Sequence, residues 1–465
     1  MSVYLYSEDW SISDILEASE KLEGKSLGEL DQSDWLQNGG NKGRIGNMIQ
    51  SDYFGIPANS DRGADFNYHG IELKVTPVKK AKNGKLYSSK ERLVLGMINY
   101  MNDFEVDFKD SLPNKKTKSM LLIFYLHEEN TQVNEFKILK SVLFNLPEED
   151  KGIVKTDYEQ ITSMIKSGRA HEITEKDQKY LGACTKGQGK GKDFVKQPFS
   201  DKDAKSRAYS YKVGYMSSYF RKLMTPEEIT HILVPKKKSF EETITSTLDK
   251  YIGKEDIEIT NTTGCKTKRT SKSYHFDVMS SMFQTNGKNV NQTDEFTKEG
   301  YAIKTVRNRF DKSKNQDMSF PNLDFTELSY DDFEESSWYS MFAETKYVLA
   351  IWDEFEEGRY RFVGYKIWKP DQELIDQAEM LFNHIQEMLQ NDKIEVYNEG
   401  KTRHQTWRDN LPKKGIFRPF QIRPKGNGES VIVTMPMTGK EIKKKALFLD
   451  KEYIKYLLEQ IGERK

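Results

Sequence analysis

Three motifs in the first half of the chain return in the same order in the second half. Each motif and its echo are separated by about half of the 465-residue chain, a period far too long for a solenoid. Three ordered matches at nearly one spacing predict two diverged copies of one domain. The pairs are KGQGKG at Lys186 with KGNGES at Lys425, RAYSYKVGYM at Arg207 with KALFLDKEYI at Lys445, and GIELKVTPV at Gly70 with GYAIKTVRN at Gly300.

The repeat sets the expected domain boundaries. We expect a first domain over residues 1–230 and a second over residues 246–465, joined by a linker at 231–245 that contains the run VPKKK. The length agrees, since about 100–200 residues per domain allows two or more domains.

The charge is balanced overall but not locally. Lys plus Arg and Asp plus Glu both total 72, which excludes a uniformly basic coat protein but allows one basic cleft. Between Lys186 and Lys222 there are ten basic residues against three acidic ones, whereas seven acids and no base fall between Asp324 and Glu344. Aromatic residues reach 12%, so the chain is expected to bury a sizeable core.

Two cysteines, Cys184 and Cys265, exclude a disulfide scaffold and a four-thiolate zinc site within one chain. The first residues show no basic region followed by an apolar run, and the apolar stretch MLLIFYL is too short to span a bilayer. We therefore expect a soluble protein of the cytoplasm.

Hydrophobic periodicity predicts a mixture of helices and strands. Residues 42–54 carry apolar side chains on one helical face, residues 71–76 alternate apolar and polar side chains, and residues 119–127 form an apolar run typical of a buried central strand. The expected class is α/β, with a mixed central sheet flanked by helices in each copy.

The candidate site lies in the sequence DFNYHGIELK. Glu72 and Lys74 point to the same face of the predicted strand, and Asp65 precedes them in a turn. Two carboxylates suit Mg²⁺, which prefers oxygen ligands, and a neighbouring lysine can orient or deprotonate an attacking water. The pattern is that of metal-dependent phosphodiester hydrolysis. The spacing alone is also compatible with a solvated edge strand, and Glu135-Phe-Lys137 has the same spacing.

Several motifs together resemble a known family. KGRIGNMIQSDYFG, GADFNYHGIELKVTPV, KERLVLGMINY and the block from GRAHEI to RAYSYKVGYM are similar, in order, to the MutH and Sau-type GATC restriction endonucleases of the PD-(D/E)xK superfamily. The resemblance covers most of residues 25–222, and the second half resembles the degenerate MutH-like copy of the Sau-type enzymes. It implies Mg²⁺-dependent cleavage of double-stranded DNA at GATC by two PD-(D/E)xK restriction-endonuclease-like domains.

The resemblance also assigns roles by position. Asp65 and Glu72 match the metal-binding carboxylates, and Lys74 matches the catalytic lysine. Gln50 stands where the family has a helix glutamate, so the site would have two carboxylates rather than three. Lys116 matches another active-site lysine, with Lys115 as its neighbour and competitor.

A basic segment further along is the expected DNA contact. Arg207 and Lys212 match the family's recognition segment, and an arginine can read guanine in the major groove with two hydrogen bonds. Tyr209 and Tyr215 interleave with these bases and would pack on sugars or, equally, on a strand face.

The glycine-rich loop before this segment is a second expected contact. Lys186 and Lys190 lie in it, where ammonium groups can approach phosphates. A solvated flexible loop is the alternative interpretation.

The second copy is predicted to be catalytically inactive. Ala302 replaces Glu72, Lys304 retains the lysine, and Glu295 falls at the position of Asp65. At the recognition segment, Lys445 replaces Arg207 and Asp450 replaces Lys212. The second domain is then regulatory or DNA-binding.

The predicted function is a type II restriction endonuclease with Mg²⁺ as cofactor and GATC-containing double-stranded DNA as partner. One active site per chain suggests dimerisation on the DNA. Two alternatives remain: a MutH-like mismatch-repair nicking endonuclease, and a catalytically impaired GATC-binding protein, for which Gln50 is the best support.

Overall fold

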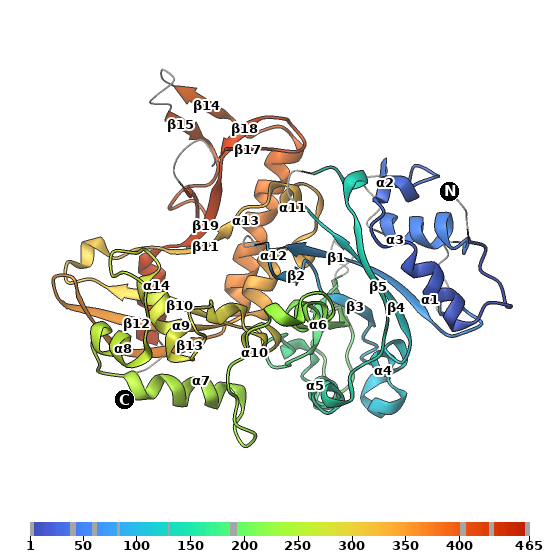
Figure 1. Cartoon of the computed structure of the whole chain (residues 1–465), viewed down its shortest axis with the longest axis horizontal. Helices are drawn as coiled ribbons and strands as arrows, with labels where there is room; N and C mark the ends of the chain where they lie inside the picture. The colour runs from blue at the N-terminus through green and yellow to red at the C-terminus, as the bar shows by residue number, and fades with distance from the viewer. Residues whose placement is uncertain are drawn as a thin grey trace. The chain divides into compact units, whose positions relative to one another are not determined.

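The computed structural model describes residues 4–37, 43–57, 63–80, 84–128, 131–186, 193–399, 406–426 and 432–460. The chain divides into two compact units, Met1–Pro226 and Glu227–Lys465 (Figure 1). No helix among these described residues is both long and apolar enough to cross a membrane.

The first unit alternates helices and strands. Its helices are α1 (Ile12–Glu20), α2 (Leu27–Leu30), α3 (Arg44–Met48), α4 (Leu112–Lys116), α5 (Glu148–Lys166) and α6 (Val213–Met224). Its strands are β1 (Glu72–Lys80), β2 (Tyr87–Ser89), β3 (Leu93–Met97), β4 (Met120–Leu126), β5 (Ile138–Phe144), β6 (Leu181–Thr185), β7 (Phe194–Val195), β8 (Ala204–Lys205) and β9 (Arg207–Tyr211).

The main sheet of this unit has the order β2-β1-β4-β5. β1 and β4 are parallel, whereas β2 pairs with β1 and β5 with β4 in antiparallel fashion. A smaller sheet of order β3-β9-β6 is antiparallel throughout. The prediction of a mixed α/β architecture is therefore confirmed for this unit.

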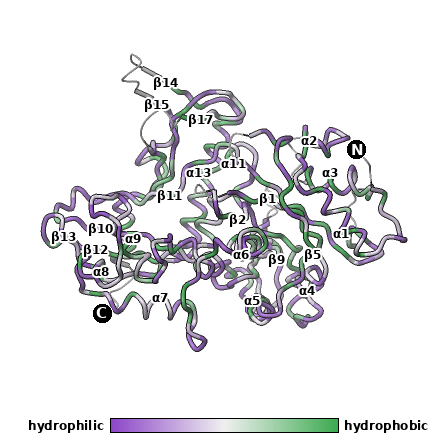
Figure 2. The backbone as a smooth tube through the Cα atoms, in the orientation of Figure 1, coloured by the Kyte–Doolittle hydropathy of each residue, from purple (hydrophilic) through white to green (hydrophobic). Residues whose placement is uncertain are grey.

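Strand β4 joins two hydrophobic cores because both of its faces are buried. Leu122 and Phe124 belong to one core, with α5, α6 and the sheet β3-β9-β6, whereas Leu121 and Ile123 belong to the other, with α1 and α3. A strand covered on both sides reads as a continuous apolar run, as MLLIFYL does. Figure 2 shows hydrophobic residues along these inner strands and hydrophilic residues on the surrounding loops.

The second unit has its own set of elements. Its helices are α7 (Phe240–Leu248), α8 (Asp256–Thr263), α9 (Tyr274–Met282), α10 (Asp294–Lys298), α11 (Phe325–Tyr330), α12 (Ser337–Tyr339), α13 (Gln372–Gln390) and α14 (Lys451–Gln460). Its strands are β10 (Tyr301–Asn308), β11 (Met318–Asn322), β12 (Lys346–Glu356), β13 (Arg359–Trp368), β14 (Val396–Glu399), β15 (Thr406–Asp409), β16 (Phe420–Pro424), β17 (Ile432–Thr434), β18 (Glu441–Lys443) and β19 (Lys445–Leu449).

Two three-stranded sheets dominate the second unit. In the sheet β10-β12-β13, β10 and β12 are parallel and β13 is antiparallel to β12. The sheet β11-β19-β16 is antiparallel. Strand β12 also divides its side chains between two cores, since Val348 and Ala350 pack with α7 and α9, while Tyr347 and Leu349 pack with α11 and α13.

The structure corrects the expectation of a linker at residues 231–245. Ile232 is buried in the core of the second unit, and Phe240 and Ile244 on helix α7 are buried in the same core. Ser239 begins this helix with a capping box that pairs its hydroxyl and backbone with Glu242. The charged run VPKKK suggested a linker, but the apolar residues around it fold into the second unit.

A buried polar network holds residues 173–181 against the first unit's smaller sheet. Asp157 on α5 accepts hydrogen bonds from the backbone N–H groups of Lys179, Tyr180 and Leu181 at 2.8, 2.7 and 2.9 Å. Arg92 forms an ion pair with Glu175 at 3.1 Å, with both side chains almost fully buried. These contacts fix the start of β6, the strand beside β9.

Replacing Asp157 with alanine is expected to destabilise the first unit strongly. Three buried N–H groups would lose their acceptor, which costs on the order of 3 kcal/mol or more. Urea unfolding measures the change, and Glu159→Ala, an exposed position on the same helix, is the control expected to stay within about 0.5 kcal/mol of wild type. Equal effects of the two substitutions would contradict a clamping role for Asp157.

Candidate active site

A tight turn brings the two predicted carboxylates together. Phe66 and Ile71 form an isolated antiparallel bridge, and Gly70 closes the turn with a φ of 66°, a conformation that favours glycine. The turn places Asp65 beside β1, where its Oδ2 accepts the backbone N–H of Leu73 at 2.8 Å. Asp65 is therefore fixed to Leu73, the residue that follows Glu72, although Asp65 and Glu72 are seven positions apart in the sequence.

Glu72 is held between two lysines. Its Oε1 lies 3.0 Å from the Nζ of Lys74, and its Oε2 lies 2.6 Å from the Nζ of Lys116. The Glu72 side chain is only 10% exposed, so both charge-assisted contacts are shielded from bulk water. Both carboxylate oxygens of Glu72 are thus paired within the chain itself.

Lys116 reaches Glu72 because of strand pairing. Helix α4 ends at Lys116 just before β4, and the parallel register sets Met120 of β4 opposite Glu72 of β1. Lys115, the alternative considered from the sequence, is exposed and is not part of this contact. Of the two neighbouring lysines, the structure brings Lys116 to the site.

Burial raises the pKa of Asp65 above its ordinary value. The Leu73 N–H and the ammonium groups of Lys74 and Lys116 act in the opposite direction, while the negative charge of Glu72 raises the pKa further. Asp65 therefore pays a desolvation cost as an anion that its neighbours only partly offset.

Gln50 lies on the same cavity as Asp65. The cavity has a volume of about 320 Å³, and Tyr6 and Tyr68 also line it. Gln50 stands in a π-helical segment, Ile49–Tyr53, which continues α3, and its Nε2 donates to the carbonyl of Pro57 at 3.4 Å. π-Helical segments often occur at functional sites because the extra residue redirects side chains.

Two nearby residues face elsewhere. Asp52 is buried and accepts the backbone N–H groups of Gln32 and Ser33, both at 2.9 Å, so its carboxylate organises that loop. A ring nitrogen of His69 lies 2.5 Å from the carbonyl oxygen of Trp10. Neither residue therefore belongs to the group around Glu72.

The donor set suits a divalent cation with few protein ligands. No group of three or more His, Cys, Asp or Glu side chains suited to a metal occurs among the described residues. Asp65 and Glu72 supply two carboxylates, and Gln50 supplies an amide on the shared cavity. Carboxylate and amide oxygens with completing waters are the ligands that hard cations such as Mg²⁺ prefer.

Lys212, predicted to contact DNA, is instead buried. It is 4% exposed, and its ammonium donates to the carbonyls of Glu175 and Gln178, the latter at 2.5 Å. It begins helix α6 while tying down the loop before β6. Because its charge is used inside the protein, Lys212 is a structural residue.

Tyr209 and Tyr215, which were also predicted to contact DNA, are buried as well. Tyr209 is fully buried in the core beneath β9, and Tyr215 is 1% exposed, stacks on Tyr180 and donates to Asp150 at 3.1 Å. Neither ring can reach DNA in this fold. The alternative of packing, which the sequence left open, is the correct one for both.

The remaining predicted DNA contacts lie at the end of the same sheet. Arg207 is 5% exposed, and its guanidinium donates to the carbonyl of Ala183 at 2.7 Å, while its Nε has no hydrogen-bond partner within the part of the chain that the structure describes. The backbone N–H of Lys186 bonds to the carbonyl of Ser206 at 3.0 Å, which places Lys186 beside Arg207. Lys190 lies outside the described residues.

The aromatic side chain of Tyr6 lies beside the site, and the sequence did not predict this position. Tyr6, near the N-terminus, lines the cavity, packs edge-on against Phe66 at 5.1 Å and accepts the backbone N–H of Tyr68 at 3.1 Å. Tyr68 is 57% exposed at the rim. Long separation along the chain hides such a contact, although an exposed tyrosine next to the motif is a local hint.

The equivalent positions of the second unit have other partners. Lys304 donates to the carbonyl of Ser319 at 2.8 Å, and burial, with the charge of Lys425, lowers its pKa to about 8. Glu295 lies 2.8 Å from His231 Nδ1 and accepts the backbone N–H of Ile232 at 2.9 Å. With Ala302 in place of a glutamate, these residues form no pair of carboxylates.

In the second unit, Lys445 and Asp450, the residues that stand at the positions of Arg207 and Lys212 in the repeated motif, also make contacts within the protein. Lys445 is buried and forms an ion pair with Asp409. Asp450 accepts the backbone N–H of Tyr453 at 2.8 Å at the start of α14, the role that favours aspartate at helix N-termini.

Comparison with known proteins identifies the family. Residues 54–157 match the family described as the DNA mismatch repair enzyme MutH. MutH of Shewanella woodyi is 26% identical over 38% of this chain and 76% of its own length, and MutH of Actinobacillus pleuropneumoniae serotype 3 is 26% identical over 50% of this chain and 97% of its own. The type II restriction enzyme Sau3AI of Staphylococcus aureus is 32% identical over 76% of this chain and 74% of its own length. The chain therefore belongs to the Sau3AI family of type II restriction enzymes.

Proposed function

We propose that this protein is a type II restriction endonuclease that cleaves double-stranded DNA at GATC, with Asp65, Glu72, Lys74 and Lys116 as its active site. The observation that carries the proposal is Glu72 held at 3.0 and 2.6 Å by two lysines beside the partly buried Asp65. This cluster lies in a chain related to a type II restriction enzyme over most of its length. The GATC specificity rests on the family resemblance.

Asp65 and Glu72 would hold a divalent cation, and we favour Mg²⁺ because all the available donors are oxygens. Such a cation lowers the pKa of a bound water and neutralises charge on the phosphodiester. Lys74 orients the attacking water through its ammonium group, and Lys116 offsets negative charge as the phosphate enters. Gln50 supports the site through its amide and brings no charge.

The DNA is proposed to run along the end of the sheet β3-β9-β6. Lys186 and Lys190 would contact phosphates, and Arg207 would contact bases after its guanidinium leaves the carbonyl of Ala183. The Nε of Arg207, which has no partner in the structure, supports this assignment.

Restriction is favoured over mismatch-repair nicking by the extent of the matches. The Shewanella MutH covers 38% of the chain, whereas Sau3AI covers 76%. A chain built only for MutH-like nicking has no need of the second unit. The alternative of a catalytically impaired binding protein is disfavoured because both carboxylates and both lysines are in place.

The second unit is proposed to be a diverged copy of the first. Gly70 and Gly300 both have φ near 66–69° directly before β1 and β10, and each of these strands pairs in parallel with a strand buried on both faces. Helices α5 and α13 are both 19 residues long.

The smaller sheets match residue for residue. β6 pairs with β9 from Leu181–Tyr211 to Thr185–Arg207, and β16 pairs with β19 from Phe420–Leu449 to Pro424–Lys445. Helices α6 and α14 follow β9 and β19 at the same spacing. The common register supports the duplication inferred from the motifs.

With one functional site per chain, cutting both strands needs two chains or two successive nicks. We propose that two chains assemble on the two-fold symmetric GATC site. Cys184 and Cys265 are both free thiols, which accords with action in the reducing cytoplasm.

Lys74→Ala is expected to abolish cleavage while DNA binding survives. Loss of the water-activating group should lower the Mg²⁺-dependent cutting rate by at least about a hundredfold, measured on unmethylated plasmid DNA. Lys137→Ala is the matched control, since Lys137 belongs to the other Glu-x-Lys sequence, is exposed and should leave the rate unchanged. Full activity of Lys74→Ala would overturn the proposed site.

Asp65→Asn is expected to stabilise the metal-free protein while it abolishes cutting. The folded state raises the pKa of Asp65, so folding favours the protonated carboxyl, and the anion costs free energy above that pKa. Asn removes the charge and can still accept the Leu73 N–H. The unfolding midpoint should rise by about 2–4 °C at neutral pH with EDTA.

The same variant has a pH signature. Its stability advantage should disappear as pH falls through the folded-state pKa of Asp65, because the wild-type carboxyl becomes neutral there. Asp110→Asn, at an exposed position, should show no such advantage. A midpoint of Asp65→Asn at or below that of wild type at neutral pH would contradict the desolvation argument.

Dimerisation is tested by sedimentation of Lys74→Ala with a short GATC duplex. We expect two chains per duplex. One chain per duplex, together with both strands cut in a single encounter by the wild-type enzyme, would refute assembly on the site.

A further inference from the structure

The second unit contains a cationic cavity beside β10, the strand whose sequence echoes that of β1. The cavity has a volume of about 760 Å³ and is lined along β10 by Ile303 to Arg307 and by the start of β11. Its cationic lining residues are Arg269, Lys272, Lys304, Arg307 and Arg309.

The carboxylate that lines this cavity among the described residues, Asp317, is already ion-paired. Asp317 lines it, but its carboxylate pairs with Arg423 at 2.5 Å and accepts the backbone N–H of Lys451 at 2.9 Å. The positive charge of the lining is therefore not balanced by Asp317.

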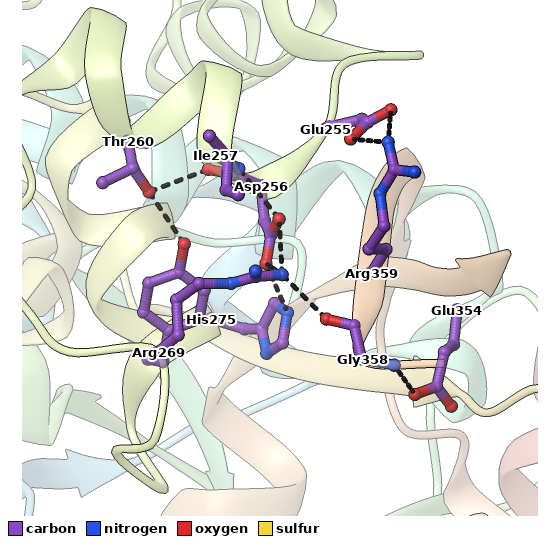
Figure 3. Close-up of polar contacts among 10 residues, drawn as sticks. Glu255, Asp256, Ile257, Thr260, Arg269, His275, Glu354, Gly358 and Arg359 are labelled. Carbon is purple, nitrogen blue, oxygen red and sulfur yellow. Dashed lines mark hydrogen bonds and ion pairs between the residues drawn. The ribbon is translucent and has the colours of Figure 1, made fainter. Parts of the chain in front are cut away.

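A polar cluster holds two of the lining residues, Arg269 and His275, in place (Figure 3). Arg269 pairs with the buried Asp256 at 3.1 Å and donates to the carbonyl of Gly358 at 2.7 Å. His275 lies beside the same carboxylate, with its Nε2 3.8 Å from Asp256 Oδ2. The cluster holds a guanidinium and an imidazole at fixed positions on the cavity wall.

Two buried nitrogens at the cavity have no hydrogen-bond partner among the described residues. They are Nε2 of His275 and Nε of Arg309. A buried polar atom without a partner costs free energy, and a ligand that accepts hydrogen bonds would remove that cost.

The positive potential acts on His275. Burial first, and then the guanidinium charges led by Arg307, lower the pKa of His275 to about 3. The imidazole is therefore neutral at physiological pH. Arg269 is paired with Asp256, and the charge of Glu354 acts against the guanidinium groups, but the net potential at His275 remains positive. An anion would meet both needs at once.

We propose that this cavity binds a terminal phosphate group, either of a free nucleoside monophosphate or of the 5′-phosphorylated end of a DNA strand. A terminal phosphate carries close to two charges and three accepting oxygens, which suits several converging cations. An internal phosphodiester carries one charge and lies on the outer surface of a duplex, so it is less able to enter a recessed cavity.

An apolar surface next to the cavity suits the attached nucleoside. A neighbouring cavity of about 640 Å³ shares Arg307 and Arg309 and is lined by Phe310, which is 75% exposed. An exposed aromatic ring beside a phosphate site can stack on a base. The proposal does not depend on the cleavage activity of the first unit.

The test measures binding to the full chain in EDTA by titration calorimetry. The probes are deoxyguanosine 5′-monophosphate, inorganic phosphate, and a short duplex without GATC that ends in either 5′-phosphates or 5′-hydroxyls. Arg309→Gln and Lys272→Gln remove cations from the cavity, and Lys272 is exposed, so its substitution should not impair folding. Arg361→Gln, at an exposed position outside the cavity lining, is the matched control.

The expected result is binding of the monophosphate that weakens about tenfold or more in Arg309→Gln and Lys272→Gln but not in Arg361→Gln. Arg309→Gln and Lys272→Gln should weaken binding of the 5′-phosphorylated duplex and leave binding of the 5′-hydroxyl duplex unchanged. Monophosphate binding without phosphorylated-end binding identifies a free nucleotide as the source, and binding of both identifies DNA ends as well.

Two outcomes would overturn the proposal. One is an equal Arg309-sensitive component for hydroxyl-ended and phosphorylated duplexes, which would mean contact with the internal backbone. The other is no binding of any phosphate probe. GATC cleavage by Arg309→Gln is measured in parallel, so that failure of the proposed activity remains distinguishable from failure of this site.

Discussion

The parallel pairing of β1 with β4 is the constraint on which the first unit depends. It buries β4 on both faces and so links the two hydrophobic cores. The same pairing aligns the start of β1 with the end of α4, which brings Lys116 to Glu72. A shift of register by one residue would turn Glu72 and Lys74 to the opposite face and dismantle both the core and the site.

The local part of the site was predictable from sequence. Asp65, Glu72 and Lys74 are close along the chain, and the alternation of β1 with the turn at Gly70 fixes their geometry. Lys116 came only from the family resemblance, because its approach depends on strand pairing that no local pattern encodes. The cationic cavity of the second unit was not predicted, since Arg269 meets Arg307 and Arg309 only after two separate segments fold together.

The errors in the recognition segment share one cause. RAYSYK carries a base at each end and two tyrosines between them, which suggested a surface segment, but β9 is the central strand of its sheet and is buried throughout. Tyr209 therefore packs in the core, and Lys212 uses its charge on buried carbonyls. Burial on both faces could not be inferred from a segment this polar, because the partners of its Lys212 ammonium lie in a distant loop, at Glu175 and Gln178.

The lysine pair around Glu72 has a consequence for how the protein is controlled. A carboxylate whose counter-charges come from its own chain needs no metal to be held in place, so folding and catalytic readiness are separate events. Under the proposed mechanism, such a nuclease can be made and stored with Glu72 already paired, and the arrival of the cation starts cleavage.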